Sequence, residues 1–146
     1  MTPQDPGFAA RVRDSFARQA VMAYLGATLT RVEPGLVEIE LPFRPELTQQ
    51  HGYFHGGVVA TIADSAAGYA AYSMMPAGSS VLSVEYKINM LAPADGDRLR
   101  ATGRVIRPGR TLTVCEFHVT VTKNATETLC ALGTETAICL PNRPDR

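Results

Sequence analysis

The sequence has no excess of charge of either sign. Its 146 residues include 14 basic and 14 acidic side chains, which cancel to a net charge of zero. No basic cluster or aromatic-basic stripe is present, whereas proteins that bind nucleic acid concentrate Lys and Arg on one surface. Nucleic acid is therefore not an expected partner.

Long apolar runs are also absent. No stretch approaches the ~20 apolar residues that a membrane-spanning helix needs. Near the N-terminus, Asp5, Arg11, Arg13 and Asp14 interrupt the apolar residues, so the hydrophobic segment of a secretory signal is missing. The sequence predicts a protein that crosses no membrane and resides in the cytoplasm.

Cysteine is scarce, and the spacing of the cysteines matches neither a disulfide framework nor a metal site. Cys115, Cys130 and Cys139 are odd in number and form no C-x-x-C pair, which argues against a disulfide framework or a zinc site. The three histidines likewise lack the spacing of a metal motif, although a metal site assembled from distant parts of the chain would leave no such pattern. We expect no metal and no cofactor, and we interpret the cysteines as small core residues.

The length fits a single domain over residues 1–146. Within it, an N-terminal helical segment is predicted over 1–25, because Phe8, Val12 and Phe16 recur at helical spacing among charged residues. This amphipathic helix should end near Gly26. The core of the domain then covers residues 26–140.

Strand patterns flank one long apolar helix. Residues 27–31 and 36–41 alternate around a turn at 33–35, which predicts two strands or one long kinked strand. Four longer β-branched segments follow the helix at 81–91, 98–107, 111–123 and 128–140. In the first of these, alternation predicts one face with Leu82, Val84, Tyr86, Ile88 and Met90 and the other with Ser83, Glu85, Lys87 and Asn89.

The helix over 58–75 is apolar on nearly every face, and the sequence 76–78, Pro-Ala-Gly, should end it. Such a helix is expected to be buried. Strands on both sides of one buried helix predict an α+β fold in which an antiparallel sheet wraps around the helix.

Asp64 is the anomaly on this helix, because an ionised carboxylate is costly among apolar neighbours unless it has partners or a use. It is either a functional group or a structural Asp bonded to a neighbouring strand. Ahead of it, Gly56 and Gly57 leave no side chains to block a ligand, and the first amides of a helix are unpaired donors that can hold an oxyanion. The same pair can also be a plain tight turn.

Several motifs together resemble a known family. They are His55-Gly56-Gly57 followed by Asp64 and Ala66, the segment 83–86 (Ser-Val-Glu-Tyr), the segment 91–97 (Leu-Ala-Pro-Ala-Asp-Gly-Asp) and the segment 109–111 (Gly-Arg-Thr). From Gly26 to the C-terminus the chain resembles the hotdog-fold acyl-CoA thioesterases, and among them the branch of the phenylacetate-pathway thioesterase. The resemblance implies a hotdog fold and an acyl-CoA substrate.

The resemblance also implies roles for individual residues. Asp64 stands at the position of the catalytic carboxylate, as general base or nucleophile, and Gly56 at that of the amide that polarises the thioester carbonyl. Gln49 matches an orienting amide, Ser83 a residue that bonds the water or the carboxylate, and His55 a residue that holds the turn. This chemistry agrees with the absence of a Gly-x-Ser-x-Gly nucleophile elbow.

Coenzyme A carries phosphates, so cations are expected near the mouth of the site. Arg44, Arg107 and Arg110 are the candidates for substrate binding beside Gly57, and each of the three is otherwise a solvated surface residue. The acyl group is not apparent from the sequence; a set of side chains able to line its pocket is Tyr53, Phe54, Tyr69, Tyr72 and Met74.

Two other functions remain open on the sequence alone. Hydratases and dehydratases share the fold, but their catalytic His lies in a different loop pattern. A non-catalytic acyl-CoA-binding module is the other alternative, because a fold does not dictate an activity.

The spacing of Gly56 and Asp64 predicts an oligomer. The two residues are eight positions apart, or roughly 12 Å along a helix that rises ~1.5 Å per residue. A base and an oxyanion donor must each lie within about 3 Å of the reacting centre. A second, antiparallel copy would bring its own Asp64 beside Gly56, so we expect at least a homodimer with shared sites. The resemblance implies that dimers pair into a homotetramer.

Overall fold

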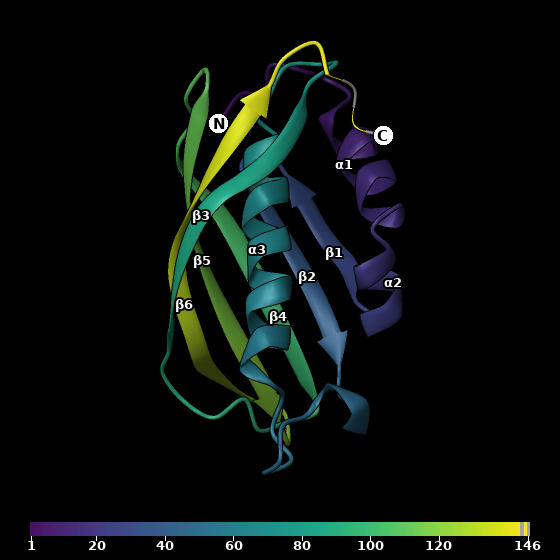
Figure 1. The fold of residues 1–146 in the computed structure, drawn as a ribbon, viewed down its shortest axis with the longest axis vertical. Coiled ribbons are helices and arrows are strands. Elements are labelled where there is room, and N and C mark those ends of the chain that lie inside the picture. Colours follow the sequence, from purple (N-terminus) through teal and green to yellow (C-terminus); the bar gives the residue numbers. More distant parts are fainter. Residues whose placement is uncertain (144, 146) are drawn as a thin grey trace.

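Helix α3 (Gly56–Tyr72) lies along the concave face of one antiparallel sheet in the computed structural model, which describes residues 1–143 and 145 (Figure 1). The six strands are arranged in the order β1-β2-β4-β5-β6-β3. Their bounds are Thr28–Glu33 (β1), Leu36–Pro42 (β2), Ser80–Met90 (β3), Arg98–Arg107 (β4), Leu112–Lys123 (β5) and Thr126–Leu140 (β6). The predicted α+β hotdog architecture is confirmed. No helix of the described residues has both the length and the hydropathy to cross a membrane.

The strand connections refine the prediction. β1 and β2 are two strands rather than one, because Gly35 (φ 76°) reverses the chain between them. β4, β5 and β6 form a meander, while β3 pairs with β6 and not with β4, its neighbour in sequence. β3 is therefore an edge strand, and one of its sides pairs with no strand of the described residues.

A β-bulge in β3 reverses the predicted alternation of side chains. The register shifts between Ser83 and Glu85, so that Ser83 lies opposite buried Ala137, and Tyr86 lies opposite buried Glu135. Directly paired residues point to the same face of a sheet. Ser83 and Tyr86 therefore both face α3, and the prediction that placed Ser83 on the face of Glu85 is wrong, because the extra residue of a bulge changes the phase of the strand.

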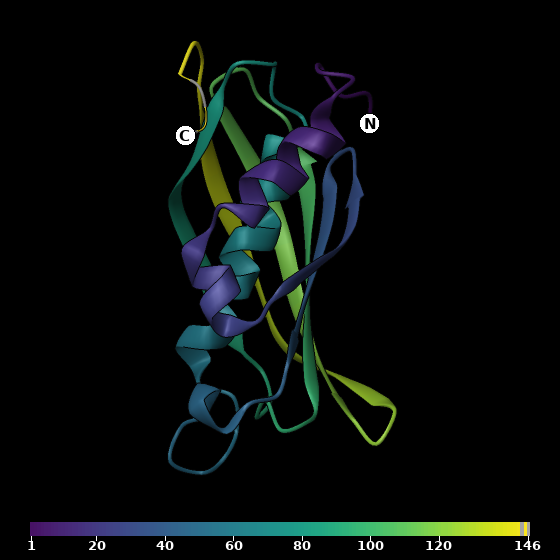
Figure 2. The ribbon, with the colours of Figure 1, turned by 90° about the vertical axis from the view of Figure 1, so that its right-hand side faces the viewer.

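The N-terminal segment forms two helices instead of the single helix predicted. α1 (Phe8–Ala17) and α2 (Ala20–Leu25) are separated at Gln19, whose backbone is extended. Both run alongside α3 next to β1 (Figure 2). Gly26 ends α2 in the left-handed conformation that glycine adopts without strain (φ 80°), so the predicted end of the helical segment is confirmed.

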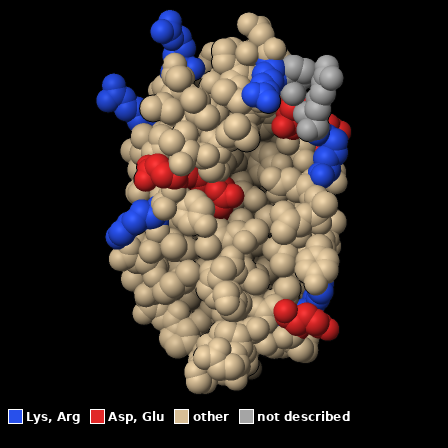
Figure 3. Space-filling model, viewed as in Figure 1, with Lys and Arg blue, Asp and Glu red and all other residues tan. Residues whose placement is uncertain are grey.

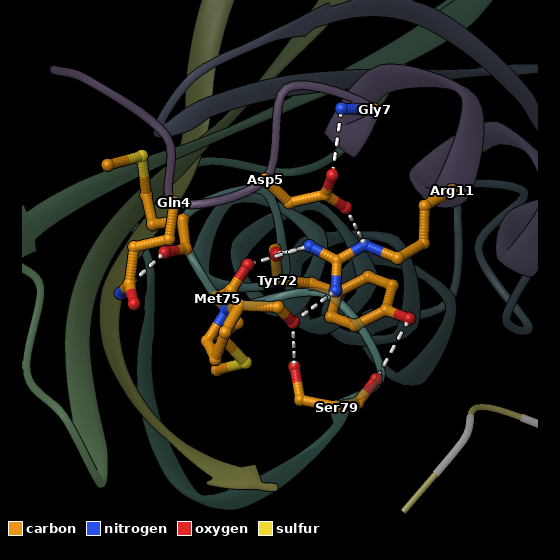
Figure 4. A network of polar contacts seen from close by, with 9 residues as sticks. Gln4, Asp5, Gly7, Arg11, Tyr72, Met75 and Ser79 are labelled. Carbon is orange, nitrogen blue, oxygen red and sulfur yellow. Dashed lines mark hydrogen bonds and ion pairs between the residues drawn. The ribbon is translucent and has the colours of Figure 1, made fainter. Parts of the chain in front are cut away.

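Arg11 of α1 binds the C-terminal end of α3 (Figure 4). Its guanidinium donates hydrogen bonds to the carbonyls of Tyr72 (3.2 Å), Met75 (2.8 Å) and Pro76 (2.7 Å) and lies 4.3 Å from the centre of the Tyr72 ring. A cation at this end complements the helix dipole and the carbonyls that lack partners in the helix. α3 stops at Tyr72, three residues before the predicted end at Met75, because the last residues tighten into single turns that present these carbonyls to Arg11.

The backbone of α3 touches the sheet directly at Gly103 of β4. A Cβ on Gly103 would lie 2.3 Å from the carbonyl oxygen of Ala66, so only glycine permits this approach. On the helix side, Ala63, Ala66 and Ala67 are fully buried. The cysteines also belong to this core, as predicted, and burial raises the pKa of the Cys115 thiol to about 12.

We predict that Gly103→Ala destabilises the protein strongly, because the new methyl group must push α3 away from the sheet. Overpacking of a core costs about 1–3 kcal/mol, and more when the backbone has to move. Urea unfolding followed by circular dichroism measures the loss. Arg104→Ala, at the neighbouring exposed position of β4, is the control and should change the free energy of unfolding by less than about 0.5 kcal/mol. Equal stability of the two variants would contradict the direct contact.

Candidate active site

The first turn of α3 leaves one amide free. His55 is the N-cap residue, and its Nδ1 accepts a hydrogen bond from the Gly57 amide (2.9 Å). Its carbonyl accepts from the amides of Val58 (2.9 Å) and Val59 (3.1 Å). None of the hydrogen bonds formed by the described residues uses the Gly56 amide. Gly56 N–H is therefore an available donor at the positive end of the helix dipole.

The loop before α3 places Gln49 beside Gly56. The short 3-10 helix η1 (Pro45–Leu47) and an isolated bridge between Thr48 and Phe54 shape this loop. Gln49 and Gly56 line one cavity of about 150 Å³, and the Oε1 atom of Gln49 accepts a hydrogen bond from the amide of His51. The other residues around the cavity are Tyr53, Phe54, Val59, Met90, Ala92, Pro93, Ala94 and Cys130.

Asp64 lies on a partly exposed stripe of α3. The C-terminal half of the helix is buried as predicted, but the N-terminal half is not buried on every face: Gly57 is exposed, and Ala60, Thr61 and Asp64 are half-buried. These positions recur every three or four residues and so share one side of the helix. The prediction of burial on nearly all faces is corrected for this half, because no element of the described residues covers that side.

Ser83 of β3 holds the Asp64 carboxylate. Its hydroxyl donates a hydrogen bond to Asp64 Oδ1 with an oxygen–oxygen distance of 2.7 Å. The contact depends on the bulge in β3, which turns Ser83 toward the helix. A charge-assisted bond of this length fixes the orientation of the carboxylate and leaves its second oxygen available.

A groove of about 280 Å³ adjoins Asp64 and Ser83. It runs between α3, the start of β3 and the N-terminal helices. In Figure 3, acidic side chains lie beside a hollow near the middle of the face that carries α3 and β3. The remaining lining residues are Ser15, Arg18, Gln19, Ser65, Gly68, Tyr69, Val81, Leu82 and Asp145.

The side chains proposed from the sequence to line an acyl pocket are divided among the cavity, the groove and the core. Tyr53 and Phe54 line the cavity at Gly56, and Tyr69 lines the groove at Asp64. Tyr72 and Met74 instead belong to the buried core.

Glu135 of β6 is a site residue that the sequence analysis missed. Its side chain is fully buried, and its Oε1 lies 3.3 Å from Ser83 Oγ. Burial raises the pKa of this carboxyl to about 8, the negative charge of Asp64 adds to the rise, and the bond to Ser83 opposes it. In the sequence Glu135 lies between two threonines, and a charged residue among polar neighbours suggests an exposed position on a strand. Because side chains of a strand alternate, Glu135 shares a face with the apolar residues Ala137 and Cys139, and this pattern would have placed it on the inner face.

The predicted cations do not gather at one place in the chain. Arg44 donates hydrogen bonds to the carbonyls of Tyr24 (3.0 Å) and Leu25 (3.3 Å) and thereby caps α2. Arg107 and Arg110 are exposed, and Arg110 lines a hollow with Pro76, past the C-terminal end of α3. These two arginines therefore lie at the end of α3 remote from Gly56.

The candidate groups thus lie in two separate places along α3, called half-sites below. Gly56 and Gln49 share one cavity, whereas Asp64 and Ser83 share a separate groove. The available amide can stabilise a negative oxygen, and the carboxylate can accept a proton or attack a carbonyl carbon. Neither half-site holds both functions within one chain.

The chain is similar to thioesterases in both sequence and structure. One protein family, the thioesterase superfamily, matches residues 51–128, which is more than half of the chain. The human protein acyl-coenzyme A thioesterase 13 is 33% identical over 110 residues, which covers 75% of this chain and 76% of that protein.

Solved structures extend the likeness to the fold. The crystal structure of a thioesterase family protein from Silicibacter pomeroyi has a TM-score of 0.92 at 47% identity and covers 92% of this chain and 99% of that one. The PaaI protein of the phenylacetic acid degradation operon in Escherichia coli is similar in fold, with a TM-score of 0.84 at 20% identity over 97% of this chain and 99% of that chain. The resemblance noted in the sequence is confirmed: the chain belongs to the thioesterase superfamily.

Proposed function

We propose that the protein hydrolyses an acyl-CoA thioester to a free acid and coenzyme A. The observation that supports this best is the combination on one helix of an available amide, Gly56 N–H, and a carboxylate, Asp64, held by Ser83. An acyl-CoA substrate is also in keeping with the name of the human relative. We also propose that the protein resides in the cytoplasm.

In the proposed reaction, Asp64 takes a proton from a water molecule, whose oxygen attacks the thioester carbon. The negative charge that develops on the carbonyl oxygen accepts a hydrogen bond from Gly56 N–H. The carbon–sulfur bond then breaks, and the thiolate of coenzyme A takes up the proton. Direct attack by Asp64, which forms an anhydride that water then cleaves, uses the same groups.

The neighbouring residues have supporting roles in this proposal. Gln49, in the same cavity as Gly56, orients the thioester and the water. His55 holds the turn through its bond to the Gly57 amide, and Gly57 leaves space for the substrate because it has no side chain. Arg107 and Arg110, exposed near the C-terminal end of α3, stay candidates for binding the phosphates, whereas Arg44 caps α2 and is a weaker candidate.

The two half-sites imply a dimer with shared sites. The unpaired edge of β3 carries exposed Leu82, Val84, Tyr86 and Met90, each at least 45% accessible. A long apolar edge strand favours pairing with another chain. A second copy related by a two-fold axis would continue the sheet at β3 and lay its α3 antiparallel to the first. Asp64 of the partner subunit would then approach Gly56, which gives two equivalent sites per dimer.

Dimers would pair into a tetramer through the outer face of the sheet. This face bears a second group of large apolar side chains that are exposed in the single chain, namely Ile106, Leu112, Val114, Leu129 and Leu132. Exposed apolar areas of this kind mark contact surfaces in soluble proteins.

We predict that the wild-type protein releases thiol from acyl-CoA and that Asp64→Asn reduces kcat by at least about 10², because an amide can neither take the proton nor attack. A thiol reagent follows the reaction over a panel of acyl groups, and calorimetry measures binding, which the Asn variant should retain. Glu116→Gln, an exposed carboxylate on β5, is the control with unchanged turnover. Tight binding of acyl-CoA without turnover by the wild type would identify a binding module, and turnover by the Asn variant would make Asp64 structural.

We predict that two inactive variants restore activity when their subunits exchange. Gly56→Ala should fold, since its Cβ would meet only the flexible end of Met90 at 3.4 Å, but it should lose about 10²–10³ in kcat through the displaced amide. Random mixing with Asp64→Asn at equal amounts leaves about a quarter of all sites intact, because half of the dimers are mixed and each has one native site. Each variant exchanged with itself is the control. Full exchange without recovery of activity would overturn the shared site.

A further inference from the structure

Glu135 is a carboxyl group enclosed in the protein directly behind the Asp64–Ser83 pair. It lies on β6 below α3, is 0% accessible, and is not among the residues that line the groove. The α3 backbone passes close above it at Gly68, where an added Cβ would lie 3.4 Å from Glu135 Oε1. Substrate in the groove would therefore meet Asp64 and Ser83 but would not touch Glu135.

The hydrogen-bond distances around Ser83 favour a proton on Glu135. Ser83 Oγ lies 2.7 Å from Asp64 Oδ1 and 3.3 Å from Glu135 Oε1, but a hydroxyl has one hydrogen to donate. The shorter contact takes that hydrogen. The lone pairs of Ser83 Oγ then face Glu135 Oε1, and two oxygens at this distance attract each other only when a hydrogen lies between them. A protonated Glu135 supplies it.

The second oxygen of Glu135 supports the same assignment. Oε2 is buried and has no hydrogen-bond partner among the described residues. An ionised carboxylate shares its charge over both oxygens, so leaving one of them buried and unpaired is costly. The carbonyl oxygen of a neutral carboxyl is tolerated more easily in such a place.

We propose that Glu135 is a positioning residue of the thioesterase site. Its protonated carboxyl group donates a hydrogen bond to Ser83 Oγ, so that the Ser83 hydroxyl donates its own hydrogen to Asp64. The relay joins one side chain each from β6, β3 and α3 and fixes the carboxylate that the proposed function uses. The inference rests on that function for its effect on the reaction, but the protonation of Glu135 can be measured without it.

Ionisation of Glu135 should break the relay at alkaline pH. The groups that face it are Asp64 from α3, Tyr86 from β3 and Cys115 from β5, the last two directly paired with it in the sheet. The Cys115 thiol, with its pKa raised to about 12 by burial, remains neutral. Once the proton of Glu135 is lost, near its pKa of about 8, Ser83 stands between two carboxylates and its hydroxyl no longer points to Asp64 alone.

The same proton makes stability depend on pH in a defined direction. The pKa of Glu135 rises from an ordinary 4.5 to about 8 in the folded protein, so the folded state keeps a proton that the unfolded state releases. The stabilisation of the folded state by this proton is complete below pH 4.5 and declines as the pH rises from 4.5 to about 8, because the unfolded chain binds fewer protons in this range.

The test compares Glu135→Gln with Glu135→Leu. The Gln amide can donate to Ser83 at every pH, so this variant should keep kcat within a few-fold at pH 7 and lose the alkaline fall of kcat near pH 8. The Leu side chain has similar volume but no donor, so kcat should fall about ten- to a hundredfold, as for a misplaced reacting group, with KM nearly unchanged. Glu116→Gln is the control and should keep the wild-type pH profile.

Two results would overturn the proposal: a Glu135→Gln variant that keeps the alkaline fall, or a folded Glu135→Leu variant with full kcat. If the Leu variant does not fold, the pH profile of the Gln variant decides alone. If the wild type hydrolyses no acyl-CoA, the proposed function has failed, and thermal unfolding from pH 4.5 to 8 still tests the proton. The stability of the wild type should then decline relative to Glu135→Gln across this range, and parallel curves would overturn the protonated state.

Discussion

The contact between the backbone of α3 and the sheet at Gly103 determines much of the rest of the structure. With the helix this close, only small side chains fit between the two layers, and Ala63, Ala66 and Ala67 fill that space. Larger groups must lie beside the contact, where β3 and the N-terminal helices border α3. The groove at Asp64 lies there, and the cavity at Gly56 lies at the start of α3, between the loop that carries Gln49 and the end of β3 at Met90.

Polar groups inside this fold are arranged in connected sets. At one end of α3, Arg11 binds three carbonyls and Asp5 pairs with it (3.2 Å). In the middle, Asp64, Ser83 and Glu135 share hydrogen bonds across the helix and two strands. At the other end, His55 satisfies the Gly57 amide and leaves the Gly56 amide free. This long helix thus has hydrogen-bond partners at its C-terminal end, a carboxylate bonded to β3 at its centre, and at its N-terminal end an amide that has no partner among the described residues.

The parts of the fold that follow from local chemistry were predictable from sequence. The α3 helix, its glycine start and all six strands follow from periodicity and turn residues, and Asp64 stands out because a charge on an apolar helix is conspicuous. The direction of Ser83 was not predictable by alternation, because one extra residue in β3 reverses the pattern and leaves no mark in the composition. Arg44 appeared to be a candidate for phosphate binding, yet it caps α2, a contact between segments that are separate in sequence. Glu135 was missed because a charged residue between two threonines suggests a solvated position, although the alternation with Ala137 and Cys139 places it on the inner face.

The bulge in β3 divides one strand into two stretches with independent constraints. Before it, the inward side chain of Ser83 donates a hydrogen bond to Asp64; after it, the inward positions are Tyr86, Ile88 and Met90. A continuous alternation could not direct both a hydroxyl at position 83 and an aromatic ring at position 86 to the same side, since they are an odd number of residues apart. Substitutions in the two stretches can therefore accumulate separately, whereas the loss of a single residue at Val84 would exchange the inner and outer faces of one stretch. For this strand, a change in length is more damaging than a change in side chain.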